Sequence, residues 1–447
     1  MFPNGFSEKM RRLLGDEYEA FLASYDASRN VGLRRNPLKT APLPDFGLQP
    51  VPWCPEGYYY DPATRPGLHP YHEAGAYYLQ EPSAMAPAEL LDPRPGERVL
   101  DLCAAPGGKA TQLAGKMQGR GLLVMNEYSA NRARILSRNA ERLGVTNALV
   151  LNETPQRLAA RFAGWFDRVL VDAPCSGEGM FRKEADAVTD WSEDTVSMCA
   201  ERQDEVLACA GAMVRPGGRL VYSTCTFSPE ENEGVIARFL ANNPDFEIEE
   251  VAAPHFAPGR PEWAGGNDAL RRTFRLWPHK LHGEGHFAAV LTRTGGTENA
   301  PAPLKAAQLP ADCAQFLKEH FDAIPEGSPV LFGDTVYLAP EETPDLTGLK
   351  VLRAGLEVGK CLRGRFEPAH ALALAIKPKA CLDFPASAPE IARYLKGETL
   401  PCSLSGWVAV CADGLVLGWG KASGGQLKNH FPKALRWVSN PVFPEKR

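Results

Sequence analysis

The 447-residue sequence has no uninterrupted apolar stretch near the roughly 20 residues that cross a bilayer. Its first residues, MFPNGFSEK, place no apolar stretch behind a basic end, so a secretory signal is not predicted. The eleven cysteines are odd in number and include no C-x-x-C pair, which argues against a disulfide framework and a zinc site. Internal repeats and low-complexity runs are also missing. We therefore expect a cytoplasmic protein with reduced thiols and no membrane association.

A general excess of positive charge is missing too, since 49 basic and 54 acidic residues give a net charge of -5. The charges are unevenly distributed along the chain. Residues 297–349 hold 2 basic and 9 acidic side chains, whereas residues 350–447 hold 15 basic and 7 acidic ones, a net +8. Only this last segment has the charge expected of a nucleic-acid-binding surface.

The length is a soft prior for about three domains, and 44% hydrophobic with 23% charged residues is typical of globular proteins. An apolar stripe of helical period from Phe6 to Leu22 predicts an N-terminal helix that ends near Tyr25. The stretch 294–304, TGGTENAPAPL, is typical of a linker. Near the end, Trp407–Val410 and Leu415–Trp419 are predicted strands around an Asp-Gly turn. We divide the chain into an N-terminal extension (1–95), an α/β domain (96–296), a linker domain (297–375) and a basic C-terminal domain (376–447).

The middle of the chain alternates short apolar runs with helical patterns. Predicted strands are Arg98–Cys103, Gly121–Asn126, Ala148–Leu151, Arg168–Val171, Arg219–Ser223 and Phe287–Thr292, and predicted helices are Ala110–Met117, Ala130–Leu143, Thr195–Val214 and Asn232–Asn242. This alternation is typical of a doubly wound parallel sheet. In such a sheet ligands bind at the carboxyl ends of the strands.

The first of these strands runs into a glycine-containing turn, Asp101–Lys109 (DLCAAPGGK), followed by a helix. Glycine lets the backbone approach a ligand closely, and a helix start offers unpaired N–H groups. The turn matches neither G-x-G-x-x-G nor a P-loop, and an ordinary strand-to-helix turn stays open as an alternative. Glu127 ends the next strand, where a carboxylate commonly binds the hydroxyls of a ribose. Together the two features favour an adenosine-bearing cofactor.

Two cysteines follow strands whose carboxyl ends should face the same crevice. Cys175 lies in Asp172–Gly179 (DAPCSGEG) and Cys225 lies in Tyr222–Thr226 (YSTCT). A free cysteine is most often a small buried hydrophobe, which is our interpretation of Cys54, Cys199, Cys209 and Cys313. Two thiols at one ligand edge instead favour covalent catalysis, in which one thiol attacks and the other handles a proton.

These motifs resemble the Nop/Sun family of RNA cytosine-5 methyltransferases in order and spacing: DLCAAPGGK, DAPCSGEG and YSTCTFSPEENE. LQEPSAM (79–85) and WPHKLHGEGHF (277–287) extend the resemblance beyond the core, and the C-terminal module is similar to that of the bacterial 16S rRNA methyltransferase F subgroup. The resemblance implies an α/β fold with a Rossmann-like class I S-adenosylmethionine-dependent methyltransferase core. It also implies that residues 1–95 form an α+β extension for RNA recognition, that residues 96–296 form the catalytic domain, and that residues 376–447 form a PUA-like β-rich RNA-binding domain.

The resemblance also implies residue roles. Cys225 would be the nucleophile, Cys175 would assist product release, and Asp172 would line the pocket for cofactor and cytosine. Lys109 would favour the thiolate as a cationic neighbour, because a free cysteine has a pKa near 8.5. S-adenosylmethionine would be bound by Cys103, Ala104, Ala105, Pro106, Gly107, Gly108, Lys109, Glu127, Arg132, Thr154 and Asp172.

The chain departs from its subgroup after the third strand, where better-known members carry an acidic residue. Here the sequence is Asn152-Glu153-Thr154, and the alignment places Thr154 at that position. Glu153 or a backbone amide could take over the recognition of adenine.

A histidine group, His279, His282 and His286, has spacing that could bind a metal in a helix, but Pro278 and two glycines would break that helix. We therefore expect no metal. In the C-terminal module, basic and aromatic side chains alternate in a manner typical of RNA contacts, although a solvated face with core aromatics is the alternative: Lys421, Lys428, His430, Phe431, Lys433, Arg436 and Trp437.

We thus expect a monomeric S-adenosylmethionine-dependent enzyme that methylates carbon 5 of cytosine in 16S rRNA or the small ribosomal subunit. Transfer RNA is the alternative substrate. Two further alternatives are a reversed order of the two thiols, as in DNA cytosine-5 methyltransferases, and a catalytically idle RNA-binding assembly factor.

Overall fold

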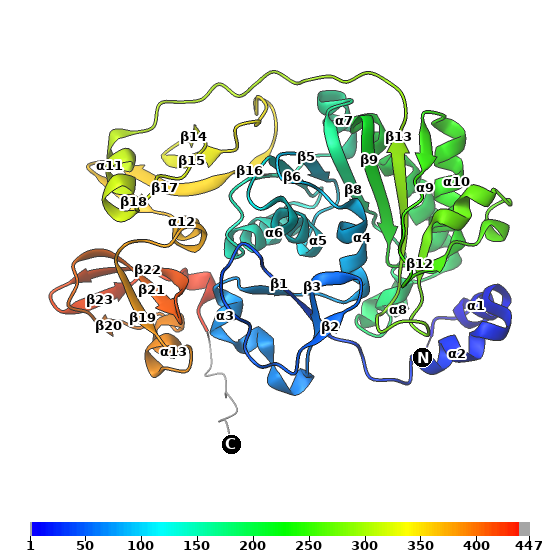
Figure 1. Cartoon of the computed structure of the whole chain (residues 1–447), viewed down its shortest axis with the longest axis horizontal. Coiled ribbons are helices and arrows are strands. Elements are labelled where there is room, and N and C mark those ends of the chain that lie inside the picture. The colour runs from blue at the N-terminus through cyan, green and yellow to red at the C-terminus, as the bar shows by residue number, and fades with distance from the viewer. Residues whose placement is uncertain (1, 438–447) are drawn as a thin grey trace.

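The computed structural model describes residues 2–437 and contains four sheets (Figure 1). The N-terminal part contains α1 (Phe6–Leu14), α2 (Tyr18–Ser24), β1 (Gly32–Arg35), β2 (Gln49–Val51), β3 (Cys54–Tyr59), α3 (Pro70–Glu73), β4 (Tyr77–Leu79) and α4 (Ala86–Leu91). Its four strands form a small antiparallel sheet in the order β2-β3-β1-β4. The single helix predicted up to Tyr25 is wrong in one respect, because a 3-10 turn at Gly15–Glu17 separates α1 from α2. Gly15 has φ 54, a left-handed conformation that breaks a helix and favours glycine.

The catalytic part is built on the largest sheet. Its elements are β5 (Arg98–Asp101), α5 (Gly108–Met117), β6 (Leu122–Asn126), α6 (Ala130–Arg142), β7 (Ala148–Leu151), α7 (Pro155–Phe162), β8 (Phe166–Asp172), α8 (Ala185–Asp190), α9 (Glu193–Met213), β9 (Val214–Thr224), α10 (Glu233–Asn242), β10 (Phe246–Ile248), β11 (Ala257–Pro258), β12 (Phe274–Leu276) and β13 (His286–Arg293). Every predicted strand and helix of this part forms, with ends shifted by a few residues.

The large sheet has the order β11-β12-β13-β9-β8-β5-β6-β7-β16, with β10 paired to β13. Strands β5 to β9 are mutually parallel, so their carboxyl ends share one edge. The expectation of a wholly parallel sheet is wrong, because β13 runs antiparallel to β9. The reason lies between α10 and β13, where residues 249–285 form short strands and turns and contain no crossover helix.

Helices cover both faces of this sheet, as Figure 1 shows. Consecutive side chains of β6 point to opposite layers, so Leu123 packs with residues of α4, α5 and α6, whereas Val124 packs with residues of α7, α9 and α10. Both side chains are fully buried. The strands are therefore apolar throughout, as expected for a sheet covered on both sides.

An extended segment leaves β13 and crosses to the C-terminal half (Figure 1). The predicted linker, residues 294–304, forms no helix or strand beyond an isolated bridge between Pro303 and Pro344. The following elements are α11 (Ala311–His320), β14 (Ser328–Phe332), β15 (Thr335–Ala339), β16 (Val351–Ala354), β17 (Leu356–Leu362), β18 (Arg365–Pro368) and α12 (His370–Ala375). Strands β14, β15, β17 and β18 form their own sheet, but β16 pairs with β7 and thereby extends the catalytic sheet.

The last module contains β19 (Cys381–Phe384), α13 (Pro389–Leu395), β20 (Leu400–Pro401), β21 (Gly406–Ala412), β22 (Leu415–Ser423) and β23 (Gln426–Asn429). The predicted turn between β21 and β22 is confirmed, with Asp413 and Gly414 both at positive φ. The module shares a hydrophobic cluster with the N-terminal sheet, and Tyr71 donates a hydrogen bond of 3.1 Å to Asp413. Residues 438–447 of the predicted 376–447 domain lie outside the described residues.

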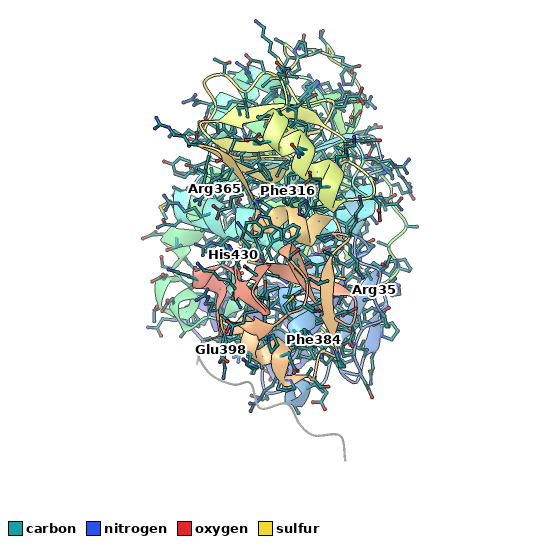
Figure 2. All side chains as sticks on the ribbon, turned by 90° about the vertical axis from the view of Figure 1, so that its left-hand side faces the viewer. Arg35, Phe316, Arg365, Phe384, Glu398 and His430 are labelled. Atoms are coloured by element: carbon teal, nitrogen blue, oxygen red, sulfur yellow. The ribbon has the colours of Figure 1, made fainter. Side chains whose placement is uncertain are left out.

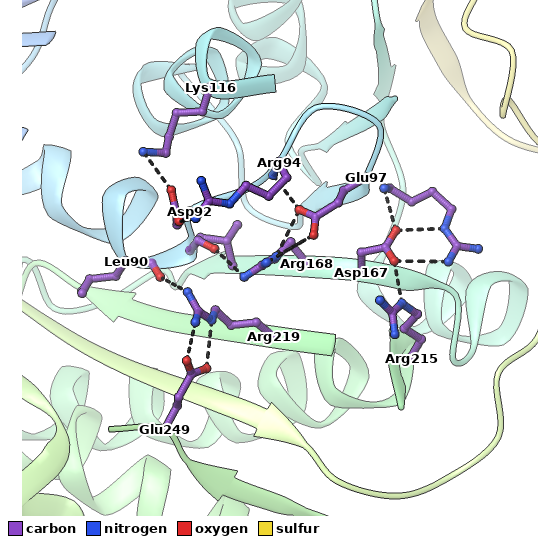
Figure 3. A network of polar contacts seen from close by, with 12 residues as sticks. Leu90, Asp92, Arg94, Glu97, Lys116, Asp167, Arg168, Arg215, Arg219 and Glu249 are labelled. Atoms are coloured by element: carbon purple, nitrogen blue, oxygen red, sulfur yellow. Dashed lines mark hydrogen bonds and ion pairs between the residues drawn. The ribbon is translucent and has the colours of Figure 1, made fainter. Parts of the chain in front are cut away.

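A network of ion pairs surrounds the amino-terminal ends of β5 and β8 (Figure 3). The Asp167 carboxylate accepts hydrogen bonds from Arg98 and Arg215, and Arg168 binds Glu97. This network lies at the end of the strands opposite to the ligand edge. In residues 2–437 no helix is long and apolar enough to cross a membrane.

Candidate functional site

Two loops at the ligand edge each carry a thiol. Asp172 ends β8, Thr224 ends β9, and the register of the two parallel strands pairs Asp172 with Ser223. The loops that follow place the Cys175 and Cys225 sulfur atoms 3.3 Å apart. The two thiols singled out in the sequence therefore lie together. The hydrogen bond with Cys225, with burial adding to it, raises the pKa of Cys175 well above its usual value, so Cys175 keeps its proton at neutral pH.

An ion pair lies beside the thiols. The Lys109 ammonium donates a hydrogen bond of 2.8 Å to Asp172, and Ser223 donates a second one of 2.8 Å to the other carboxylate oxygen. Burial opposes the charge of Asp172, but the charge of Lys109 and the hydrogen bonds from Lys109 and Ser223 outweigh it and lower the pKa of Asp172. Burial likewise opposes the charge of Lys109, yet Asp172 outweighs it and raises the pKa of Lys109. Both groups are therefore charged at neutral pH.

Two further titratable groups face this pair. Burial, with the nearby charge of Asp172, raises the pKa of Asp101 to about 8. Burial and the Lys109 charge lower the pKa of His286 to about 4, so its imidazole is neutral. Lys109 and Asp172 are thus charged, whereas the nearby Asp101 and His286 are neutral at neutral pH.

The glycine turn after β5 begins α5 at the same edge. Gly107 has φ 116 and caps the helix, and a Cβ atom there would lie 3.3 Å from Leu136, so this turn favours glycine. The Ala104 amide donates 2.8 Å to the Asn126 carbonyl, which ties the turn to the end of β6. The predicted cofactor residues of this turn follow one another from the end of β5 into the first turn of α5: Cys103, Ala104, Ala105, Pro106, Gly107, Gly108 and Lys109.

Glu127 lies where predicted, directly after β6, and its carboxylate accepts a hydrogen bond of 2.8 Å from the Ser129 amide. Arg132 lies 3.5 Å from Glu127 and donates to the Ala105 carbonyl at 2.7 Å. The carboxylate and the glycine turn therefore lie on neighbouring parallel strands, β6 and β5. A turn that admits close backbone approach and a carboxylate one strand away fit the adenosine and methionine parts of a nucleoside cofactor.

Thr154 and Glu153, the two residues after β7 considered for adenine recognition, both make contacts within the protein. The Thr154 hydroxyl accepts a hydrogen bond from the Arg157 amide and caps α7. The Glu153 carboxylate accepts the Lys350 amide at 2.8 Å and pairs with Arg157 at 3.2 Å. Glu153 therefore links β7 to the segment that enters β16. The structure gives Thr154 a capping contact, and its predicted cofactor contact stays a prediction.

The chain matches four family models along its length. They are 16S rRNA methyltransferase RsmB/F (residues 88–292), the N-terminal domain of 16S rRNA methyltransferase RsmF (2–82), the RsmF rRNA methyltransferase first C-terminal domain (315–376) and the methyltransferase RsmF PUA domain (381–437).

Curated relatives match over nearly the full length. Ribosomal RNA small subunit methyltransferase F from Erwinia tasmaniensis is 32% identical over 97% of this chain and 96% of its own. The protein of the same name from Shewanella loihica is 33% identical over 87% of this chain and 84% of its own. The chain belongs to the RsmF family of 16S rRNA methyltransferases.

Solved structures show where the RsmF-family fold is shared. A methyltransferase homologue from Pyrococcus horikoshii is 30% identical with a TM-score of 0.56, over 64% of this chain and 94% of its own. NSun6 from Pyrococcus horikoshii with SFG has the same TM-score at 22% identity, over 66% of this chain and 99% of its own, which shows a common fold. The predicted Rossmann-like methyltransferase core and C-terminal PUA module are confirmed. The predicted limits of the four domains stay predictions.

The three histidines of this RsmF-family chain have separate surroundings. His279 hydrogen-bonds Glu17, His282 is exposed and accepts the Tyr59 hydroxyl at its carbonyl, and His286 is buried beside Ser83. Within residues 2–437 no cluster of three or more His, Cys, Asp or Glu side chains is placed to hold a metal ion.

The PUA module separates the basic and aromatic residues predicted to contact RNA. Lys421 and Lys428 are exposed and paired across β22 and β23, and the Lys421 ammonium lies 5.5 Å from the Trp407 ring centre. His430 packs against Trp407 with ring centres 4.6 Å apart. In Figure 2, which faces the C-terminal half, Arg365 lies above His430. Phe431 is in the core, as the alternative of core aromatics predicted, so it is not available to stack on a base.

The other three residues of the predicted set differ in exposure. Lys433 is exposed, whereas Arg436 is half-buried and donates to the Phe431 carbonyl. Trp437 is half-buried, and its amide donates to Leu395. The alternating sequence pattern thus mixes a basic surface with core residues.

Sequence reasoning missed three side chains of the site. Ser223 binds Asp172, and Glu178 and Glu231 are fully buried carboxylates next to the thiol loops. The last two stand inside the motifs DAPCSGEG and SPEENE, but received no role. For Glu178 the available signal was an acidic residue between two glycines at a ligand edge, whereas Glu231 lies among other acidic and polar residues and gave no such signal.

Proposed function

We propose that the protein transfers a methyl group from S-adenosylmethionine to carbon 5 of cytosine in 16S rRNA, through a covalent bond between Cys225 and carbon 6 of the base. The observation that carries this proposal is the 3.3 Å distance between the Cys175 and Cys225 sulfur atoms, on the loops that follow β8 and β9. Membership of the RsmF family supports rRNA as the substrate.

The first step needs a nucleophile, because carbon 5 of cytosine does not attack a methyl group unaided. Cys225 adds as a thiolate to carbon 6, forming a C–S bond, and the electron pair of the C5–C6 double bond moves into the ring. Lys109 lies close enough to interact electrostatically with Cys225, and its positive charge favours the thiolate. Bound S-adenosylmethionine would supply the electrophilic methyl group on its sulfonium, which carbon 5 takes up while the sulfur keeps the electron pair.

The second step releases the product. When the carbon-5 proton leaves, its electron pair restores the double bond, and the C–S bond breaks with its electrons returning to Cys225. The contact with Cys225 that raises the pKa of Cys175 is lost once Cys225 is bonded to carbon 6, so Cys175 can then pass its proton to water and receive the proton from carbon 5. The thiol pair then ends with the protons that it had at the start.

The residues that follow β5 and β6 support S-adenosylmethionine as the cofactor. Residues Cys103 to Lys109 and Asp172 would surround its methionine part, while Glu127, with Arg132 behind it, would bind the ribose. Thr154 would lie near the adenine, at the start of α7.

The RNA would be held by surfaces on both halves of the chain. The N-terminal sheet and the PUA module share one hydrophobic cluster, so they form a continuous unit beside the catalytic sheet. Lys421 and Lys428 supply exposed charges for phosphates on this unit.

The test is methylation of separate RNA pools with labelled S-adenosylmethionine. Small ribosomal subunits, naked 16S rRNA and bulk transfer RNA are incubated with the protein, and 5-methylcytidine is mapped by sequencing. Label in 16S rRNA supports the proposal and identifies the assembly state that is recognised. Label only in transfer RNA overturns the substrate, and label in no pool favours an idle RNA-binding factor.

A further inference from the structure

The Glu178 carboxylate, on the loop that carries Cys175, binds the loop that carries Cys225. Glu178, three residues after Cys175, accepts the Phe227 amide at 2.7 Å and the Ser228 hydroxyl at 2.6 Å. The Trp191 indole donates a third hydrogen bond at 2.9 Å. Glu178 therefore fixes the backbone just after Cys225.

The Glu231 carboxylate, on the loop that carries Cys225, binds the loop that carries Cys175. Glu231, six residues after Cys225, accepts the Ser176 amide at 2.9 Å and the Ser176 hydroxyl. Gln203 donates a further hydrogen bond of 2.9 Å. Glu231 therefore fixes the backbone just after Cys175.

The two loops are also in direct contact. The Gly179 amide donates 2.8 Å to the Cys225 carbonyl, and a Cβ atom at Gly179 would lie only 2.9 Å from that oxygen. The Ser176 and Thr226 hydroxyls hydrogen-bond at 2.9 Å. Small residues at these positions thus let the loops approach closely.

Both carboxylates are expensive to bury. Each side chain is fully buried, and within residues 2–437 neither forms an ion pair with a Lys, Arg or His side chain. Burial, with the charge of Glu178 adding to it, raises the pKa of Glu231 to about 7. A buried carboxylate that is hydrogen-bonded but has no cation beside it still costs stability, so a role beyond stability is the better explanation for two of them at one site.

We propose that Glu178 and Glu231 are positioning residues that cross between the thiol loops, Glu178 fixing Cys225 for attack and Glu231 fixing Cys175 for release. The assignment of one step to each thiol rests on the proposed function. The reciprocal arrangement makes the two carboxylates separable, because each binds the backbone beside a different thiol.

The test separates the attack and release steps in the full-length protein with 16S rRNA and S-adenosylmethionine. Single-turnover measurements give the rate at which the covalent protein–RNA adduct forms and the rate at which it decays. Glu231→Gln should slow adduct decay about tenfold and leave its formation within about twofold, because one charged hydrogen-bond acceptor is lost beside Cys175. Glu178→Gln should slow adduct formation by a similar factor and leave decay unchanged.

The matched control is Glu230→Gln, the same substitution one residue from Glu231. Glu230 is exposed and bonds Lys9 rather than the Cys175 loop, so both rates should stay at the wild-type value. Two milder variants repeat the test if a glutamate variant does not fold. Ser176→Ala removes a donor to Glu231 and should slow decay, and Ser228→Ala removes a donor to Glu178 and should slow formation.

Equal effects of the Glu178 and Glu231 variants on both rates would overturn the proposal, since they would indicate a merely structural role. Cys175→Ala and Cys225→Ala run alongside and test the proposed function separately. If Cys225→Ala instead forms the adduct, the thiols exchange roles and the two glutamate variants must exchange their effects. If neither thiol variant changes the amount of covalent adduct, unchanged methyl transfer in both glutamate variants overturns the proposal that Glu178 and Glu231 position the thiols.

Discussion

The sulfur atoms of Cys175 and Cys225 lie 3.3 Å apart, although 50 residues separate them in the chain. This distance follows from topology, because β8 and β9 are adjacent parallel strands and each thiol comes shortly after its strand ends. Two thiols in contact can share a proton, and the raised pKa of Cys175 keeps that proton on Cys175. The topology of the sheet therefore accounts for the contact between the two thiols.

We expect Cys225→Ala to abolish methyl transfer, because no nucleophile then reaches carbon 6. Cys175→Ala should leave attack intact and accumulate a covalent protein–RNA adduct, because release is slowed. The adduct is measured by gel shift after denaturation, with labelled RNA. Cys199→Ala, which changes a buried thiol on α9, is the control and should retain wild-type turnover without an adduct. Turnover by Cys225→Ala would instead favour the reversed order of thiols.

The second prediction concerns the ion pair of Lys109 and Asp172. Lys109→Met leaves the Asp172 carboxylate without its cation, so its pKa should rise and the protein should lose about 3 kcal/mol of stability. Adding Asp172→Asn should recover part of this loss, because no unpaired charge then remains. Urea unfolding of the two single variants and the double variant measures the coupling. Losses that add to within about 0.5 kcal/mol would show that the pair is not coupled.

Local patterns in the sequence predicted most of the catalytic fold. The strands from β5 to β9 each contain a short apolar run and the helices between them have a clear period, so both were recognised with shifts at their ends. The antiparallel direction of β13 was missed, because strand direction depends on the path of residues 249–285 and leaves no trace in the strand itself. The pairing of β16 with β7 was missed for the same reason, since the two strands are far apart in the sequence.

The candidate site divides in the same way. Cys175, Cys225 and Asp172 could be placed at one edge because they follow parallel strands. The carboxylates of Glu178 and Glu231 could not, because their partners are backbone amides of another loop, and such pairings exist only after the loops pack. Phe431 could not be placed in the core or on the surface, because a basic stretch that alternates with aromatics has the same sequence pattern whether the rings are exposed or buried.

The third prediction uses the neutral carboxyl group of Asp101. Its pKa is raised to about 8 in the folded protein, whereas an unfolded aspartate has a pKa near 3.9. The folded state thus holds a proton that the unfolded state has lost between these values. The stabilising contribution is fully present below about pH 4 and is lost as the pH rises toward about 8.

Asp101→Asn mimics the protonated carboxyl and does not titrate. The stability of the variant relative to the wild type should therefore rise by about 1.4 kcal/mol per pH unit between about pH 4 and about pH 8. Urea unfolding of both proteins across this range measures the difference. A difference that does not change with pH would mean that Asp101 is ionised in the folded protein. Asp268→Asn, at an exposed carboxylate, is the control and should show no comparable trend.

The last prediction concerns the basic surface of the PUA module. Lys421 and Lys428 are exposed neighbours on paired strands, so two phosphates of a bound RNA can lie against them. Each lysine that contacts a phosphate displaces counterions when the RNA binds, which makes the affinity fall with salt concentration. Replacing both lysines with glutamine should weaken binding of all RNA sequences alike and reduce the slope of log affinity against log salt by about 1 to 2.

Titration of labelled 16S rRNA fragments at several salt concentrations measures this slope. The matched control is Lys305→Gln, which removes one exposed lysine from the acidic segment 297–349 and should leave the slope unchanged. The substitutions are far from the thiols, so turnover at saturating RNA should stay at the wild-type level while the RNA concentration for half-maximal rate rises. An unchanged slope in the double variant would place the RNA on another surface, because counterion release depends on the charges that the phosphates meet.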